Sequence, residues 1–302
     1  LQLRALGAKV NLIREKHWKY VDNSDSKWGS GEVSKYRLEN YNYMLKKWNL
    51  KPVKAEVSFF SLISQDRTLD EYFDCIKEMK MPKDKMHWII VVDNKNVKML
   101  ERVKEKAKDF NFLTTKIYFT NEQDGYMSHN FTERANRITR NLKYMINEAI
   151  KFNNYTPFFF MLEDDTLAPK NAFTKLWKLI KDDEQMVYVS GVEPAKCADR
   201  HLGVGHLYAN EQGEIFDRII PAPKKSGLES FESGGWYCWI GRTDILAKHK
   251  FRVIEDGRYL GPDTLMVYDL KRQGYKTMTD WSIACKHYDW EHKHWIPVSE
   301  GR

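Results

Sequence analysis

The sequence has no long hydrophobic segment and no closely spaced pair of cysteines. No apolar run in its 302 residues approaches the roughly 20 residues of a membrane-spanning helix, so we predict no transmembrane segment. The four cysteines lie far apart without a C-x-x-C pair, which argues against a zinc site and provides no disulfide framework. A reducing compartment is the simplest setting for them, no signal peptide is recognised, and we therefore expect a cytoplasmic protein.

Apolar and aromatic residues are abundant. Hydrophobic residues make up 42% of the chain and aromatic residues 14%, which suffices for a sizeable core and excludes a disordered chain. The net charge of +7 is moderate, and the lysines are spread along the chain instead of forming one block. This charge suits anionic ligands such as nucleotides, and it permits nucleic acid without requiring it.

One stretch organises the chain. Five apolar residues, 158–162, run directly into Glu163, Asp164 and Asp165. The apolar run is short and aromatic, which indicates a buried strand, and the acids then follow its carboxyl end. Three adjacent carboxylates repel one another unless a cation neutralises them, and a hard divalent ion such as Mg²⁺ is a suitable partner. The alternative is a solvated acidic turn that follows a core strand.

Strands and helices alternate along most of the chain. Ser64, Asp93, Thr120 and Glu163 follow or end predicted strands, and we expect them to lie along one edge of a sheet. This pattern predicts an α/β fold with a mostly parallel, Rossmann-like central sheet flanked by helices. The predicted strands are 56–63, 87–92, 116–119, 158–162, 186–190, one within 233–241, and 276–284; the predicted helices are 69–79, 97–110, 132–152, 171–180, 243–248 and 264–273. We expect residues 195–225 to form a long loop, and residues 1–54 to form an N-terminal extension.

With these residues placed, the chain resembles the nucleotide-sugar glycosyltransferases of the GT-A fold, in particular the family-2-like inverting enzymes. The resemblance rests on Leu162-Glu163-Asp164-Asp165, which matches the DxD motif, and on three further segments that occur in the expected order. These are Val91-Val92-Asp93-Asn94, Gly234-Gly235-Trp236 and Gly261-Pro262-Asp263, with His287 beyond them. The resemblance implies a nucleotide-sugar-binding half, 55–193, and an acceptor-binding and catalytic half, 194–302.

The resemblance also implies a role for each candidate residue. A divalent metal, Mn²⁺ or Mg²⁺, is expected on Asp165 and His287. The other implied roles are donor binding by Asp93, Glu163, Asp164, Arg137 and Arg140, acceptor binding by Gly234, Gly235, Trp236 and Trp239, and general-base catalysis by Asp263. UDP-sugars are the favoured donors. The acceptor is a glycan, a small molecule or a modified base in DNA.

The sequence departs from the family pattern in two respects. Pro262 replaces one of the two acids that often precede the late helix, so the role of base falls on Asp263 alone. The Q-x-x-R-W motif and the membrane helices of processive polysaccharide synthases are absent, which favours transfer of a single sugar.

Other interpretations of the same residues stay open. Asp263 would also suit a helix cap, and His287 a surface cluster with His292 and His294. A nucleotidyltransferase that makes nucleotide sugars is a second enzymatic function. The loop at 64–68 lacks the glycines that such enzymes place after their first strand, which counts against it. A third function is non-catalytic binding of carbohydrate or nucleic acid on the same scaffold.

Overall fold

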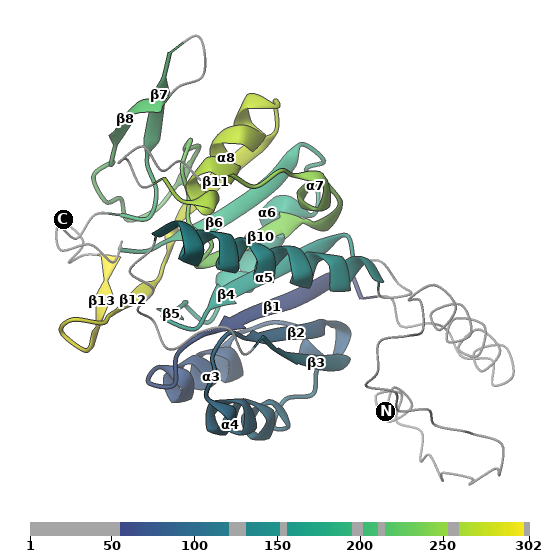
Figure 1. The fold of residues 1–302 in the computed structure, drawn as a ribbon. Coiled ribbons are helices and arrows are strands. Elements are labelled where there is room, and N and C mark those ends of the chain that lie inside the picture. Colours follow the sequence, from purple (N-terminus) through teal and green to yellow (C-terminus); the bar gives the residue numbers. More distant parts are fainter. Residues whose placement is uncertain are drawn as a thin grey trace, which may run out of the picture. The chain divides into compact units, whose positions relative to one another are not determined.

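An eight-stranded mixed sheet forms the centre of the structure (Figure 1). The computed structural model describes residues 55–120, 131–151, 156–194, 202–210, 215–252 and 260–298, and residues 55–302 form one compact unit. The predicted N-terminal extension, residues 1–54, lies outside the described residues.

The strands agree with the predicted pattern and add several short members. The strands are β1 (Val57–Ile63), β2 (His87–Val92), β3 (Thr114–Phe119), β4 (Phe158–Glu163), β5 (Thr166–Leu167), β6 (Met186–Val192), β7 (His206–Ala209), β8 (Ile215–Ile219), β9 (Leu228–Glu229), β10 (Cys238–Arg242), β11 (Lys276–Ala284), β12 (Lys286–Asp289) and β13 (His294–Pro297). The helices are α3 (Leu69–Glu78), η1 (Lys83–Lys85), α4 (Val97–Ala107), α5 (Phe131–Lys151), α6 (Ala172–Ile180), α7 (Thr243–Lys248) and α8 (Pro262–Arg272).

The strand order of the main sheet is β3-β2-β1-β4-β10-β6-β11-β9. The first four strands are parallel, β6 and β11 are parallel to each other, and β10 runs antiparallel between β4 and β6. The chain therefore builds outward from β1 through β2 to β3 and then returns to place β4 on the other side of β1. The carboxyl ends of β1 and β4 form a topological switch point, where open α/β sheets bind ligands.

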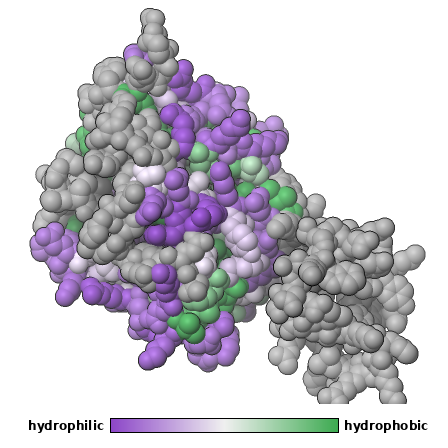
Figure 2. All heavy atoms as spheres, viewed as in Figure 1, coloured by the Kyte–Doolittle hydropathy of each residue, from purple (hydrophilic) through white to green (hydrophobic). Residues whose placement is uncertain are grey.

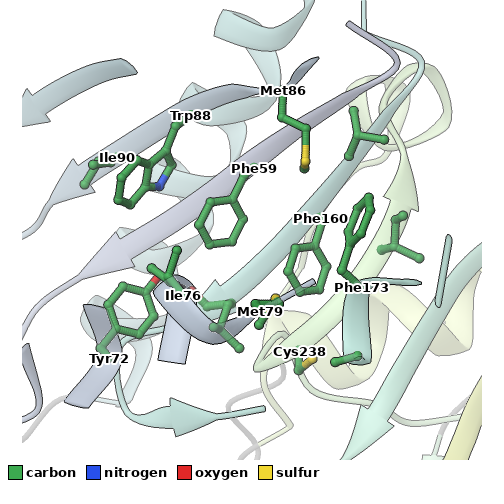
Figure 3. Close-up of a cluster of buried hydrophobic side chains, with 14 of the residues drawn as sticks. Phe59, Tyr72, Ile76, Met79, Met86, Trp88, Ile90, Phe160, Phe173 and Cys238 are labelled. Atoms are coloured by element: carbon green, nitrogen blue, oxygen red, sulfur yellow. Dashed lines mark hydrogen bonds between the residues drawn. The ribbon is translucent and has the colours of Figure 1, made fainter. Parts of the chain in front are cut away.

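Helices cover both faces of this sheet, and both faces are therefore apolar. Helices α3, α4 and α6 pack on one face, where Phe59 and Phe160 stack at 5.5 Å beside Trp88 and Phe173 (Figure 3). Helices α5, α7 and α8 pack on the other face. Among the described helices, none combines the length and the apolarity that crossing a bilayer requires. Hydrophilic residues predominate over the described surface in the view of Figure 2.

The expectation of a long loop at 195–225 is wrong for residues 206–209 and 215–219, whereas residues 220–225 form neither helix nor strand. Strands β7 and β8 form an antiparallel pair there, which projects from the sheet in Figure 1. Leu207 and Ile215 of this pair are buried in a cluster with Leu265 and Tyr268 of α8. The strands are short, and a contact with a distant helix stabilises them, so local periodicity does not reveal them.

Helix α8 begins two residues earlier than the sequence pattern predicts. Pro262 occupies its first turn, a position that tolerates proline because its missing N–H would have no partner within the helix. Asp263 consequently lies in the first turn of the helix and not ahead of it.

Candidate functional site

Asp164 joins the two strands at the switch point. Its Oδ2 accepts hydrogen bonds from the backbone N–H groups of Ser64 and Gln65, at 2.6 and 2.8 Å, where the chain leaves β1. The side chain is buried, with the residue only 3% exposed. Two buried N–H donors stabilise the ionised carboxylate. Asp164 thus fixes the β1 loop against the end of β4, whereas Glu163 beside it is partly exposed.

Asp165 and His287 are brought together by a small three-stranded sheet, β13-β12-β5. Strand β12 pairs with β5, which places His287 opposite Thr166, and the backbone N–H of Tyr288 donates to the carbonyl of Asp165 at 3.0 Å. His287 Nε2 then lies 3.6 Å from Asp165 Oδ2. His287 is 3% exposed, so it is not part of a surface histidine cluster.

The hydrogen bond at Nδ1 of His287 determines which ring nitrogen carries the proton. His287 Nδ1 lies 2.8 Å from the carbonyl oxygen of Pro194, which only accepts, so Nδ1 carries the proton. In the neutral ring Nε2 then has a lone pair that faces the Asp165 carboxylate. Nε2 is buried and has no hydrogen-bond partner among the described residues. A metal-binding histidine typically donates its second N–H to a carbonyl or carboxylate in this way.

These two side chains fit a divalent cation. A lone pair and a carboxylate that face each other in a buried site are unfavourable unless a cation lies between them. The carboxylate suits Mn²⁺ or Mg²⁺, and the imidazole nitrogen, a ligand of transition metals, favours Mn²⁺ of the two. Within the described ranges, no three His, Cys, Asp or Glu residues gather in a metal-binding arrangement. A two-residue site leaves coordination positions for water and substrate phosphate oxygens, as is usual for Mg²⁺.

Glu193 is a member of the site that the sequence analysis missed. It follows β6, is 4% exposed, and accepts a hydrogen bond from Thr166 Oγ1 through Oε2 at 2.9 Å. Its Oε1 lies 4.0 Å from His287 Nδ1. A single acid between a valine and a proline carries no motif, so only the contacts of its side chain with Thr166 and His287 identify it.

Asp93, at the end of β2, has a partner on each oxygen. Oδ1 accepts from Thr120 Oγ1 and Oδ2 accepts from Arg137 Nε, both at 2.9 Å. Arg137 reaches this position from α5, whereas the side chain of Arg140 is exposed one turn further along that helix. The structure therefore brings Arg137 to the strand ends, with Asp93 as its anchor.

Gly234 and Gly235 pack against two tyrosine rings. A Cβ at Gly234 would lie 2.5 Å from Tyr188 Oη, and one at Gly235 would lie 2.4 Å from the ring of Tyr237. The Tyr188 hydroxyl also donates to the carbonyl of Gly235 at 2.8 Å. Only a residue without a side chain allows the backbone to approach these rings so closely.

Tyr188 also connects this segment with the two acids nearby. Burial raises the pKa of Tyr188, and the negative charges of Asp263 and Glu193 add to that rise. Asp263 is partly exposed, and its Oδ1 lies against Gly261. The charges of both acids therefore act on the tyrosine that packs against the Gly234–Gly235 segment.

Trp236 and Trp239 lie in the core. Trp239 is fully buried, with ring-centroid distances of 4.7 Å to Phe159 and 5.2 Å to Tyr188. Trp236 is 3% exposed and meets the edge of the Phe251 ring at 5.6 Å. Stacking on a sugar or base requires an accessible ring face, so neither indole enters the acceptor surface proposed below.

Comparisons with known proteins define the class of fold. No protein-family model matches the chain, and no curated protein matches it in sequence. The described fold is that of the GT-A-type glycosyltransferases, as the sequence predicted.

Two solved structures illustrate this likeness. The crystal structure of GalNAc-T7 with UDP, GalNAc and Mn²⁺ is similar with a TM-score of 0.54 and 11% identity, over 79% of this chain and 44% of that one. A mannosyltransferase from Pyrobaculum calidifontis, PcManGT, in complex with GDP-Man and Mn²⁺, has a TM-score of 0.49 and 14% identity, over 82% of this chain and 63% of that one. The chain thus spans less than two thirds of the length of either protein, and identities this low establish the fold alone.

Proposed function

We propose that this chain is a metal-dependent glycosyltransferase that transfers one sugar from a nucleoside diphosphate sugar to an acceptor hydroxyl, with inversion at the anomeric carbon. The observation that carries the proposal is the pair of Asp165 Oδ2 and His287 Nε2, which face each other at 3.6 Å at the carboxyl edge of a GT-A sheet. UDP-sugars are the favoured donors.

The metal would be held by Asp165 and His287, and it would act as a Lewis acid for the negative charge on the departing diphosphate. Several residues of the chain organise its surroundings. Pro194 and Glu193 orient the imidazole ring, and Asp164 holds the β1 loop against the acids. Arg137, anchored on Asp93, offers its remaining guanidinium N–H groups to the nucleotide diphosphate.

Asp263 is the proposed general base. It takes the proton of the acceptor hydroxyl as the new bond forms between that oxygen and the anomeric carbon. The bond from the anomeric carbon to the diphosphate oxygen breaks at the same time, and its electron pair leaves with the nucleotide. Attack from the side opposite the leaving group inverts the anomeric centre. The start of α8 favours the ionised carboxylate, because the helix N-terminus carries a partial positive charge.

The acceptor surface lies beside the same helix. Gly234 and Gly235 run against Tyr188, which is close enough to Asp263 for its pKa to respond to that charge. Because the rings of Tyr188 and Tyr237 fill the space beside these buried glycines, any contact with the acceptor would be made by their backbone groups. We infer a glycan, a small molecule or a modified DNA base as the acceptor.

Donor hydrolysis tests the proposal. The protein is incubated with UDP-, GDP-, TDP- and CMP-sugars in Mn²⁺ or Mg²⁺ and then in EDTA, and the released nucleotide is measured. We expect metal-dependent release from one donor, reduced at least a hundredfold in Asp165→Asn and in His287→Gln. Asp289→Asn and His292→Gln form a matched control, because these residues make a similar pair at 2.8 Å on the exposed turn after β12.

Two outcomes would overturn the proposal. Release that EDTA or the two site variants leave unchanged would exclude a catalytic metal on Asp165 and His287. Formation of pyrophosphate from a nucleoside triphosphate and a sugar phosphate, without any transfer from nucleotide sugars, would establish the nucleotidyltransferase function instead.

A further inference from the structure

A cavity of about 660 Å³ lies between the end of α7, the segment that follows it and the end of α8. A volume of this size is typical of small-molecule sites. It is remote from the candidate active site. At the start of α7, the N–H of Thr243 donates to the carbonyl of Pro157, the residue just before β4. Tyr275, which lines the cavity, is the residue just before β11. The cavity thus lies at the edge where the parallel strands start, and the acids lie at the edge where they end.

The cavity wall is strongly cationic. Lys248, Lys250, Arg252 and Arg272 line it, and Asp269 is the one carboxylate among the lining residues that the structure describes. Both oxygens of the Asp269 carboxylate accept hydrogen bonds from Arg252, at 2.9 and 2.7 Å. Neither Lys248 nor Lys250 makes an ion pair with a residue that the structure describes. Among the residues that the structure describes, Lys248, Lys250 and Arg272 therefore retain three positive charges without a carboxylate partner.

Helix ends explain only part of this charge. Lys248 and Arg272 are in the last turns of α7 and α8, where cations are favoured by the helix dipole. Lys250 and Arg252 lie beyond the end of α7, so the dipole gives no reason for them. Arg272 is also held in place, since its Nη1 donates to the hydroxyl of Tyr268 at 3.1 Å.

The remaining wall offers ring faces, apolar surface and a histidine. Tyr268, Tyr275 and Ile245 contribute aromatic and apolar surface to the cavity. His249 lines it as well, and its Nε2 is buried without a hydrogen-bond partner in the described ranges. Such a wall complements a ligand with both an anionic group and a ring, since cations bind phosphate oxygens and tyrosines pack on planar groups.

We propose that this cavity binds a phosphate-bearing small molecule of nucleotide or sugar-phosphate size, at a site distinct from the donor site. Helix α8 joins the two sites. Asp263 lies in its first turn and Arg272 in its last, nine residues apart, or about 14 Å along the helix axis. Occupation of the cavity would therefore stabilise the helix that carries the proposed base.

Binding of inorganic pyrophosphate in EDTA tests this site without the donor site, because the proposed donor site requires metal. Calorimetry on the full chain should give one bound pyrophosphate. Lys248→Gln combined with Lys250→Gln should weaken binding at least tenfold. Lys98→Gln combined with Lys178→Gln is the matched control, since it removes the same charge from exposed lysines on α4 and α6 and should change binding less than twofold.

Histidine resonances locate the ligand. Pyrophosphate should shift the imidazole signal of His249, assigned by its loss in His249→Gln, and should leave that of His287 in place. No binding to the unaltered chain, equal weakening by both pairs of variants, or a shift at His287 alone would overturn the proposal. Uridine without phosphate should bind at least tenfold more weakly than uridine monophosphate; equal affinity would show that the cavity does not recognise phosphate. None of these measurements depends on metal-dependent donor hydrolysis. The proposal of a phosphate-binding cavity and the proposal of glycosyltransferase activity can therefore fail independently.

Discussion

Arg137 donates from Nε to Oδ2 of Asp93 at 2.9 Å, and only 10% and 2% of these two side chains are exposed. A buried ion pair of this kind is costly to break from one side, because the remaining charge stays in the interior. Removing one partner of such a pair typically costs about 3 to 5 kcal/mol.

We therefore expect Arg137→Leu to lower the free energy of unfolding by about 3 kcal/mol, measured by urea denaturation. Arg102→Leu is the control. Arg102 pairs with Asp66 and Asp70, but 42% of its side chain is exposed, so its loss should cost less than about 1 kcal/mol. Equal effects of the two substitutions would show that the Asp93 pair is not a buried anchor.

We expect the adjacent acids Asp164 and Asp165 to have different roles, the first in stability and the second in metal binding. Asp164→Ala removes the acceptor of two backbone N–H groups, a buried one at Gln65 and a partly buried one at Ser64, and an unsatisfied buried group costs about 1 to 3 kcal/mol. We expect a large loss of stability without any metal present. Asp165→Asn should instead remove the rise in melting temperature that Mn²⁺ and UDP together produce. If both substitutions acted alike in both assays, the division of roles between the acids would be wrong.

Gly234 should tolerate a methyl group only when Tyr188 is shortened. A Cβ at Gly234 would lie 2.5 Å from Tyr188 Oη, and forced overpacking typically costs about 1 to 3 kcal/mol. Gly234→Ala should therefore destabilise the protein by this amount in the unaltered background. The same substitution in a Tyr188→Phe background should cost less, because the contacted oxygen is gone. A double-mutant cycle by urea denaturation measures the difference, and additive effects would contradict the expected clash.

We expect the stability of the chain to decrease as the pH decreases, because of the buried His87. Burial, together with the charge of Lys116, lowers the pKa of His87 from 6.5 to about 4. The unfolded chain therefore binds a proton between these values that the folded chain does not. The contribution of neutral His87 to the free energy of unfolding is fully present above pH 6.5. It is lost as the pH falls toward 4, and the loss reaches about 3 kcal/mol.

His87→Gln should flatten this part of the profile of unfolding free energy against pH. The exposed His294 serves as the control, and His294→Gln should leave the slope between pH 4 and 6.5 unchanged. A slope that survives in His87→Gln would assign the pH dependence to other groups.

Local sequence determined the main strands and the fold class of this protein. The parallel strands β1, β2 and β4 are buried on both faces, so each is predominantly apolar, and in β2 and β4 an unbroken apolar run marks most of the strand. The predicted α/β class and the mostly parallel sheet are confirmed, and the acids after β4 lie at the strand end where the pattern places them. The roles of Asp165, His287 and Asp263 stay predictions.

The tertiary structure decided which side chains meet. His287 faces Asp165 because β12 pairs with β5, more than one hundred residues earlier in the chain, and Glu193 joins them from β6. Trp239 lies in the core because β10 is inserted between β4 and β6. Strand periodicity depends on neighbouring residues alone, whereas pairing depends on which distant surfaces bury each other. The sequence by itself therefore determined the strands and the acidic edge, and only the packed sheet decided which groups share the site.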